Sequence, residues 1–352
     1  MLNDLPGGPP LAWPRLREHG DIKIMSHNVN GIRARLNNDK GGASGFLSML
    51  RTEAPDMIFL QEFRCLSSDF LSKRGVQEAL AELGYGLLLN NASSDPNAGY
   101  AGVAVLSRIP AVSWGRGVDD SSTSFNLDTE GRLIWVNMGG IIIVNIYAPN
   151  SGTPGKDLRF LEKRLAFDGL IRKKVASLAR KFKKPLLLLG DFNVTQGAPD
   201  VYEHLDEDHW LRHPACTTEE RSSFKELISL RDFVDVQNHL GLSGHTFWRN
   251  AIHKTAGLGM RLDYVLAEKK LLPSLHGFEI MEDTYGSDHA PVCIRMAAEL
   301  FSVPCTRDSS KSSPKSFLTL PALQTLASIF EQSTGSHYEN ARQVLHQLDA
   351  RS

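Results

Sequence analysis

Short apolar runs separated by turns rich in Gly, Asn and Asp recur along the chain from Ile22 onward. Runs of this length between turn residues predict β-strands. The expected strands cover residues 22–28, 56–61, 85–90, 102–108, 132–138, 141–149, 185–193, 261–268 and 290–296. Between them, apolar residues at helical spacing predict helices over 43–54, 76–84, 158–184 and 218–232.

The order of these elements predicts the fold class. Some expected strands follow one another in hairpin order and others are separated by helices, a mixture that favours two sheets packed face to face with helices outside. Residues 1–20 are rich in Pro and Gly and are expected to form a disordered tail. Residues 21–299 hold the predicted strands, and residues 300–352 are expected to form a polar Ser/Lys linker and a short helical C-terminal tail.

The composition narrows the class of protein. The chain has 352 residues, of which 41% are hydrophobic and 22% charged, as in ordinary soluble globular proteins. The net charge of −1 means that nucleic-acid binding would need positive potential confined to one face. The four cysteines have no CxxC spacing, which argues against a zinc site or a disulfide framework and favours a reducing compartment.

The hydropathy of the chain also predicts where it acts. No apolar run approaches the roughly 18 residues that span a bilayer, and the N-terminus has no continuous apolar leader. The sequence therefore predicts an intracellular protein without a membrane partner. If the source is eukaryotic the expected compartment is the nucleus, and otherwise it is the cytoplasm.

Polar residues that end or begin apolar strands are the informative ones. Any one of them could simply be a turn residue, because strand ends need turns and Asn and Asp supply them. Six strands bounded in the same way instead suggest a rigid scaffold that positions chemical groups at one edge. These residues are Asn28, Asn30, Gln61, Glu62, Tyr147, Asn150, Asp191, Asn193, Asp263, Asp288 and His289.

The residue types in this set indicate a chemistry. Carboxylates and amides without thiolate clusters are hard oxygen ligands, suited to Mg²⁺ or Mn²⁺ rather than zinc. A histidine with an aspartate to orient it supplies a general base, and asparagine and tyrosine supply neutral donors toward an anionic oxygen. The sequence contains no GxSxG, Walker or GxGxxG motif. Metal-assisted hydrolysis of a phosphate ester is therefore the favoured reaction.

Nine segments of the chain resemble, in order, the signature segments of the endonuclease/exonuclease/phosphatase superfamily, and within it the exonuclease III-like apurinic/apyrimidinic (AP) endonucleases. The segments are "HNVNGIRARL", "FLQEFRC", "GYAGVAVLSR", "EGR", "YAPNSG", "GDFNV", "TFW", "RLDYVL" and "GSDHAPV", within residues 22–297. The resemblance implies an α/β fold, a four-layer α/β/β/α sandwich of two mostly antiparallel sheets flanked by helices. Residues 21–299 would then be the catalytic domain.

The resemblance implies a metal site and a set of catalytic roles. Glu62 is the expected principal ligand of Mg²⁺ (or Mn²⁺), and the other residues expected beside the metal are Asn30, Asp288, Asp191 and Asn193. His289, oriented by Asp263, would be a base or a phosphate-polarising group. Asp191 would position or deprotonate the attacking water, and which of the two takes the proton stays open.

The resemblance also implies contacts to DNA. Tyr147 and Asn150 are expected to contact phosphate, and Asn28 and Asn193 to orient groups around the scissile phosphate. Further residues expected to bind the substrate are Tyr100, Arg132, Phe247, Met260 and Leu262, the last three around a pocket that admits a sugar lacking its base. Vertebrate-type relatives insert an arginine and a methionine into the DNA grooves, and here Thr153 and Ala251 are the residues expected at those places.

The implied function is that of a Mg²⁺-dependent AP endonuclease of base excision repair. Such an enzyme hydrolyses the phosphodiester 5′ to an abasic site, leaves a 3′-hydroxyl, and is expected also to trim blocked 3′ ends as a 3′-phosphodiesterase or 3′–5′ exonuclease. The expected partner is double-stranded DNA bound by a monomer, with other repair proteins reached through the C-terminal tail. Two alternatives stay open: a retrotransposon-type endonuclease that nicks intact DNA, since "VNIYAPNSGTP" also resembles those modules, and a non-catalytic DNA- or partner-binding relative.

The tail leads to the first prediction. Residues 303–352 follow the last motif-bearing strand, so their removal should leave catalysis unchanged. The measurement compares incision of a DNA duplex by the full chain and by a chain ending at Ser302, together with their thermal unfolding. Loss of folding in the shortened chain would instead show that the C-terminal segment packs on the sandwich.

Overall fold

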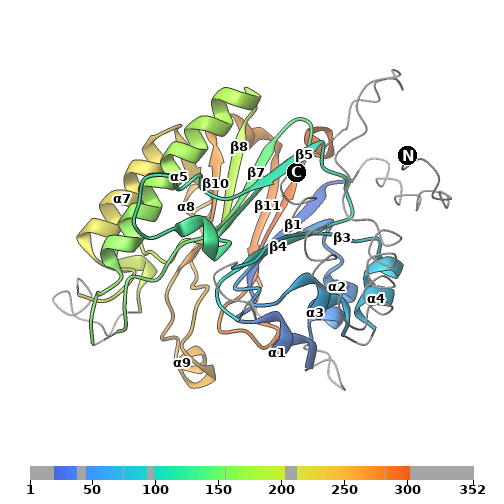
Figure 1. Ribbon diagram of the computed structural model, residues 1–352, viewed down its shortest axis with the longest axis horizontal. Helices are drawn as coiled ribbons and strands as arrows, with labels where there is room; N and C mark the ends of the chain where they lie inside the picture. The colour runs from blue at the N-terminus through green and yellow to red at the C-terminus, as the bar shows by residue number, and fades with distance from the viewer. Residues whose placement is uncertain are drawn as a thin grey trace, which may run out of the picture.

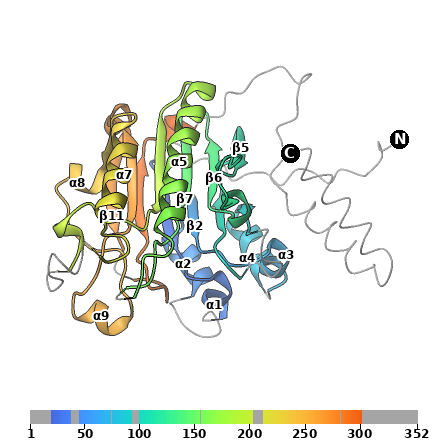
Figure 2. The same ribbon diagram turned by 60° about the vertical axis from the view of Figure 1, so that its left-hand side comes forward.

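Two six-stranded sheets pack face to face in the computed structural model, which describes residues 20–37, 45–73, 75–92, 99–154, 156–202, 212–281 and 283–301 (Figures 1 and 2). The first sheet runs in the order β11 (Leu275–Ile280), β12 (Val292–Met296), β1 (Ile22–Asn28), β2 (Met57–Gln61), β4 (Val103–Ser107), β3 (Gly86–Asn90). The second runs in the order β5 (Ser113–Arg116), β6 (Leu133–Asn137), β7 (Ile142–Tyr147), β8 (Leu186–Asp191), β10 (Asp263–Glu268), β9 (Phe233–Asp235).

Helices cover the outer face of each sheet. The first sheet is covered by α1 (Ile32–Asn37), α2 (Phe46–Glu53), α3 (Ser67–Leu71) and α4 (Val76–Leu83). The second is covered by α5 (Leu161–Phe182) and α7 (Thr218–Ser229), and α8 (Val236–His239) follows β9. Only β1–β2 and β7–β8 pair in parallel among the described strands, and the remaining neighbours pair antiparallel. The predicted four-layer sandwich of mostly antiparallel sheets is confirmed.

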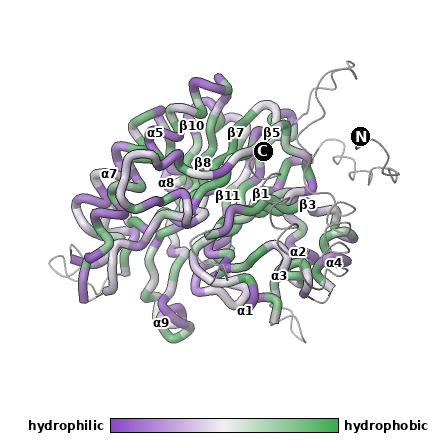
Figure 3. The backbone as a smooth tube through the Cα atoms, in the orientation of Figure 1, coloured by the Kyte–Doolittle hydropathy of each residue, from purple (hydrophilic) through white to green (hydrophobic). Residues whose placement is uncertain are grey.

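The central strands are apolar on both faces because each face meets another layer. Along β1 and β2, Ile24 and Phe59 point into the core between the sheets, whereas Met25 and Ile58 point toward the helices. Successive side chains of a strand alternate between faces, so a strand buried on both sides becomes a continuous apolar run. Figure 3 shows this: hydrophobic colour follows the inner strands, and hydrophilic stretches recur along the outer helices α5 and α7.

The carboxyl ends of four strands come together because of the parallel pairs. Asn28 at the end of β1 lies opposite Gln61 at the end of β2, and Tyr147 at the end of β7 lies opposite Asp191 at the end of β8. Gln61 Nε2 donates to Asn145 Oδ1 at 2.7 Å, which ties the two sheets together just inside this edge. We call this end of the sandwich the strand-end edge.

The end of the folded domain differs from the prediction. Leu300 and Phe301 belong to the sandwich rather than to the tail: the Phe301 side chain is fully buried in the core between the sheets. Gly140 N–H donates to the carbonyl oxygen of Leu300 at 2.9 Å. The tails predicted before residue 20 and after residue 301 lie outside the described residues. Among the helices that the structure describes, none is both long and apolar enough to cross a membrane.

Candidate active site

Two carboxylates at the strand-end edge are joined through neutral donors. Tyr147 Oη donates to Glu62 Oε1 at 2.7 Å, across the gap between the sheets. Asn28 Nδ2 lies 2.9 Å from Asp191 Oδ2 and 3.3 Å from Glu62 Oε1, so it links the two acids. Burial and the nearby Glu62 charge raise the pKa of Tyr147, which keeps its hydroxyl protonated as a donor.

The backbone around these acids adopts an uncommon conformation. Asn30, Glu62, Arg64 and Asn193 all have left-handed backbones, with φ of 44°, 51°, 49° and 46°. Asparagine tolerates this region, but glutamate and arginine rarely adopt it. Hydrogen bonds hold the turn, since Gly31 N–H donates to the Glu62 carbonyl at 2.9 Å. Backbone strain of this kind persists where the surrounding structure enforces it, typically at functional sites.

The oxygens expected to hold the metal converge on a positive charge. Arg64 donates to Glu62 Oε2 through Nη2 and to Asn30 Oδ1 through Nη1, the latter at 3.1 Å. Asp288 is half-buried in the turn before β12. A carboxylate and an amide oxygen that share a cation fit a hard divalent ion. Within the described ranges, no three His, Cys, Asp or Glu side chains form a metal cluster.

Asp191 and Asn193 lie beside this site and are hydrogen-bonded to each other. Asn193 donates to Asp191 through its backbone N–H at 2.8 Å and through Nδ2 at 3.2 Å. Asn150 Nδ2 lies 3.5 Å from Asn193 Oδ1, so the amide predicted to contact phosphate is adjacent. Burial raises the pKa of Asp191 to about 7, and although His289 opposes the shift, the Asp263 carboxylate adds to it.

His289 and Asp263 form the predicted pair. Nδ1 of His289 lies 2.7 Å from Asp263 Oδ2, and both side chains are buried. Burial lowers the pKa of the imidazole, but the charge of Asp263 and its hydrogen bond outweigh this and raise it to about 10. A carboxylate on Nδ1 leaves Nε2 as the nitrogen available to a substrate. The ring is therefore positively charged at neutral pH and suited to polarising an anionic oxygen.

Two residues that hold this pair were not predicted. Thr246 Oγ1 accepts the backbone N–H groups of Leu262 and Asp263, each at 3.0 Å, and so fixes the start of β10. Ser287 Oγ donates to the Asn28 carbonyl at 2.6 Å and accepts the His289 N–H at 3.2 Å. Both lie inside quoted motifs, "TFW" and "GSDHAPV", yet a hydroxyl in a motif does not reveal which backbone group it binds.

Arg132 is placed differently from the prediction. Its side chain is buried, so it is not exposed for direct contact with DNA. The guanidinium lies 4.6 Å from the centre of the Tyr147 ring, and Nη2 donates to Tyr100 Oη at 2.7 Å. Tyr100 is 47% exposed. Arg132 therefore orients two tyrosines, and Tyr100 is the exposed residue of the group.

The three predicted pocket residues come together, but two of them are buried. Phe247 and Met260 exchange backbone hydrogen bonds of 2.9 Å in both directions. Met260 and Leu262 pack with Val201 in a small apolar cluster and are each 4% exposed. Phe247 is half-buried and its ring centre lies 4.9 Å from that of His289. Met260 and Leu262 thus support Phe247 from behind rather than lining an open surface.

An apolar side chain near Ala251 projects from the strand-end edge. Residues 248–258 form a finger that carries α9 (Ala251–Thr255), and it extends from the same end of the molecule as α1 (Figures 1 and 2). Ile252 in this helix is 78% exposed. Ala251, the residue expected at the place of a groove-inserting side chain, is the preceding residue and is also exposed. Hydrophobicity alone does not distinguish an exposed isoleucine from a buried one.

Comparison with known proteins agrees with this geometry. The Endonuclease/Exonuclease/phosphatase family matches residues 25–289. The chain is 31% identical over 288 residues to Recombination repair protein 1 of Drosophila melanogaster, which covers 81% of this chain but 38% of that protein. It is 29% identical over 287 residues to DNA repair nuclease APEX1 of Danio rerio, covering 79% and 83% of the two chains. The crystal structure of AP endonuclease LMAP from Leishmania major shares the fold, with a TM-score of 0.66, 24% identity, and coverage of 80% and 89%.

The contact between His289 and Asp263 gives a prediction. His289→Ala and Asp263→Ala should each lower the single-turnover cleavage rate by about 10²-fold, the scale of a lost acid–base or charge-stabilising group. The double variant should lose little more than either single variant, since an orienting carboxylate matters only while its histidine is present. The measurement is single-turnover DNA cleavage by the four proteins. Losses that multiply would show that the two residues act independently.

Proposed function

Because the chain belongs to the Endonuclease/Exonuclease/phosphatase family, we propose that it is a divalent-metal-dependent AP endonuclease of base excision repair. It would hydrolyse the phosphodiester 5′ to an abasic site, leave a 3′-hydroxyl, and also trim blocked 3′ ends. The observation that carries the proposal is the joined set of Glu62, Tyr147, Asn28 and Asp191 beside the His289–Asp263 pair. The names of the Drosophila and zebrafish relatives support a role in DNA repair.

Each residue of the site would have its own role in the reaction. Asp191, whose carboxylate is held by Asn28 and Asn193, would position the attacking water and accept its proton. The positively charged His289 would face a non-bridging phosphate oxygen through Nε2 and stabilise the charge that develops there. Glu62 and Asn30, with Asp288 nearby, would hold Mg²⁺ (or Mn²⁺), which supplies a Lewis acid for the phosphate and the leaving oxygen.

The rest of the edge would bind the substrate. Tyr100 and Asn150 are exposed at the edge and would contact the DNA backbone. Phe247, supported by Met260 and Leu262, would pack against the abasic sugar, and a base on that sugar would be too large for the same space. We also propose that the protein acts as a monomer on double-stranded DNA, inside the cell, in the nucleus of a eukaryote or the cytoplasm of a prokaryote.

One experiment tests the function. A duplex with a single abasic analogue and the same duplex without it are incubated with the protein in Mg²⁺ or in EDTA. We expect cleavage 5′ to the abasic analogue with a 3′-hydroxyl product, in Mg²⁺ only. Nicking of the intact duplex at a similar rate would indicate a retrotransposon-type endonuclease. Binding without cleavage would indicate a non-catalytic relative and overturn the proposal.

The metal ligand gives a prediction of its own. Glu62→Gln removes the charge that anchors a hard cation, so activity should fall by at least about 10²-fold at low Mg²⁺ and recover partly as Mg²⁺ is raised. Mn²⁺ binding followed by electron paramagnetic resonance should weaken in parallel. Glu226→Gln, on the outer face of α7, is the matched control and should change neither quantity. Wild-type activity of Glu62→Gln at submillimolar Mg²⁺ would exclude Glu62 as the ligand.

The exposed isoleucine of α9, Ile252, gives another prediction. Ile252→Ala should raise KM for the abasic duplex about fivefold and leave kcat little changed, because an apolar side chain inserted at a base step stabilises bound, distorted DNA. Leu230→Ala, an exposed leucine at the end of α7, is the control. Equal kinetics for Ile252→Ala and wild type would show that the finger does not enter the duplex.

A further inference from the structure

A buried arginine lies directly behind the candidate site. Arg164 in α5 is 1% exposed, and its guanidinium has three polar partners. Nη1 donates to the carbonyl oxygens of Asn193 at 2.9 Å and Pro149 at 3.2 Å, and Nε donates to Asp168 Oδ1 at 2.9 Å. A charged side chain is costly to bury, so its partners indicate what its position achieves.

The two carbonyls belong to the loops that carry the site. Pro149 immediately precedes Asn150, and Asn193 is itself a site residue. These loops follow the parallel strands β7 and β8, which end at Tyr147 and Asp191. A single guanidinium nitrogen therefore bridges both loops. Asn193 Nδ2 adds a second link between them by donating to the Ala148 carbonyl at 2.9 Å.

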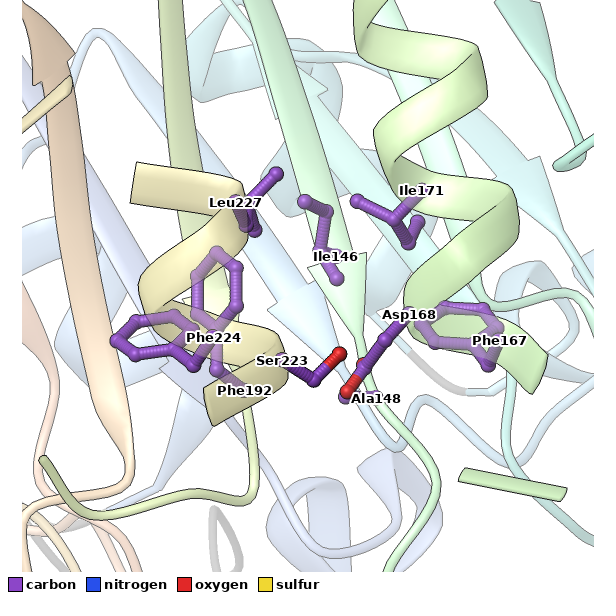
Figure 4. A pocket seen from close by; sticks show the side chains of 9 residues that line it. All are labelled: Ile146, Ala148, Phe167, Asp168, Ile171, Phe192, Ser223, Phe224 and Leu227. Carbon is purple, nitrogen blue, oxygen red and sulfur yellow. The ribbon is translucent and has the colours of Figure 1, made fainter. Parts of the chain in front are cut away.

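Asp168 fixes the orientation of this guanidinium from the other side. It lies one helical turn after Arg164 and lines a small pocket between α5, α7 and the second sheet (Figure 4). Figure 4 shows the Ser223 hydroxyl pointing toward the Asp168 carboxylate. Ser223 Oγ in turn accepts from Arg172 Nη1 at 2.7 Å. The pocket is otherwise lined by apolar side chains, so Asp168 has Arg164 as its principal charged neighbour.

We propose that Arg164 is a positioning residue, which fixes the spacing of the β7 and β8 loops and thereby the place of Asn150 and Asn193 relative to Asp191. Asp168 holds the plane of the guanidinium so that one nitrogen reaches both carbonyls. The inference rests on the proposed function, because it concerns how the site is arranged for phosphodiester cleavage. An arginine is needed here since its planar fork presents several donors in fixed directions, whereas a lysine has one compact ammonium.

The variants separate positioning from general support of the fold. Arg164→Met removes all three hydrogen bonds, and Arg164→Lys keeps the charge without the fork. Lys174→Met is the matched control, because Lys174 is a buried cation in the same helix and pairs with Asp119 rather than with the site loops or Asp168. The assays are steady-state cleavage of an abasic duplex, thermal unfolding, and hydrogen exchange of the substrate-free protein in segments 146–152 and 190–196.

We expect Arg164→Met to lower kcat by at least about tenfold with KM within about twofold, since small misplacements of catalytic groups act on the chemical step. Arg164→Lys should not restore kcat. Hydrogen exchange should rise in both segments for Arg164→Met, whereas Lys174→Met should lower the unfolding temperature without changing kcat or exchange there. The loss from Arg164→Met combined with Asn193→Ala should be less than the product of the single losses.

Two results would overturn the proposal. If Lys174→Met lowers kcat as much as Arg164→Met at equal loss of stability, Arg164 only supports the fold. If Arg164→Lys is fully active, the fork is not required. Because the exchange measurement needs no substrate, it tests the placement of the loops even if the wild-type protein fails to cleave abasic DNA, an outcome that would reject the proposed function alone.

Discussion

The hydrogen bond from Tyr147 to Glu62 joins the ends of two strands that belong to different sheets, and the site depends on this junction. Each sheet contains one parallel pair, β1–β2 or β7–β8, and parallel strands end on the same side. When the two pairs face each other across the core, four strand ends arrive at one edge. The fold therefore brings Asn28, Tyr147 and Asp191 together at the strand ends, with Glu62 one residue beyond the end of β2.

Hydrogen bonds just inside the strand-end edge explain why polar side chains can be buried between two apolar sheets. Gln61 and Asn145 hydrogen-bond to each other in the core, and Asn145 Nδ2 also donates to the Leu60 carbonyl at 3.0 Å. A buried amide without partners would cost free energy, roughly 1–3 kcal/mol for each unsatisfied group. These bonds fix the register of one sheet on the other. Apolar packing alone would allow the sheets to slide, and the strand ends would then lose their alignment.

The sequence predicted much of the fold and many of the polar residues that meet at the strand-end edge. Strands buried on both faces, such as β2 and β8, are continuous apolar runs that stand out against polar turns. The missed strands are different: β5 and β9 have four and three residues. β11 has only half-buried and exposed residues and contains a register shift between Leu275 and Gly277. Short edge strands have little apolar pattern, so pairing with a neighbour decides their conformation.

The site residues were predictable by type, but their surroundings were not. A carboxylate or amide at a strand end can be recognised in the sequence, because the apolar run shows where the strand stops. Whether a charged residue is buried depends on which groups from distant parts of the chain pair with it. The local sequence pattern does not predict those partners. Arg132 was therefore expected at the DNA surface, and Arg164, within the helix predicted over 158–184, was given no role. Their places are set by contacts with Glu130, Tyr147 and Asn193, which lie elsewhere in the chain.

Three buried arginines lie around the strand-end edge, and each forms an ion pair with a carboxylate. Arg132 pairs with Glu130, Arg164 with Asp168, and Arg261 with Asp200. Arg132 and Arg164 also donate to segments of the site, the Tyr147 and Asn193 carbonyls. Arg261 instead ties the chain two residues before Asp263 to Asp200, since its backbone N–H donates to the Asp200 carbonyl at 2.9 Å. Buried ion pairs often stabilise a fold less than apolar side chains of the same size would. Their directional hydrogen bonds hold loops at fixed places, which apolar contacts do less well. A site whose acids and donors must stay aligned within fractions of an ångström gains more from such placement than from added stability.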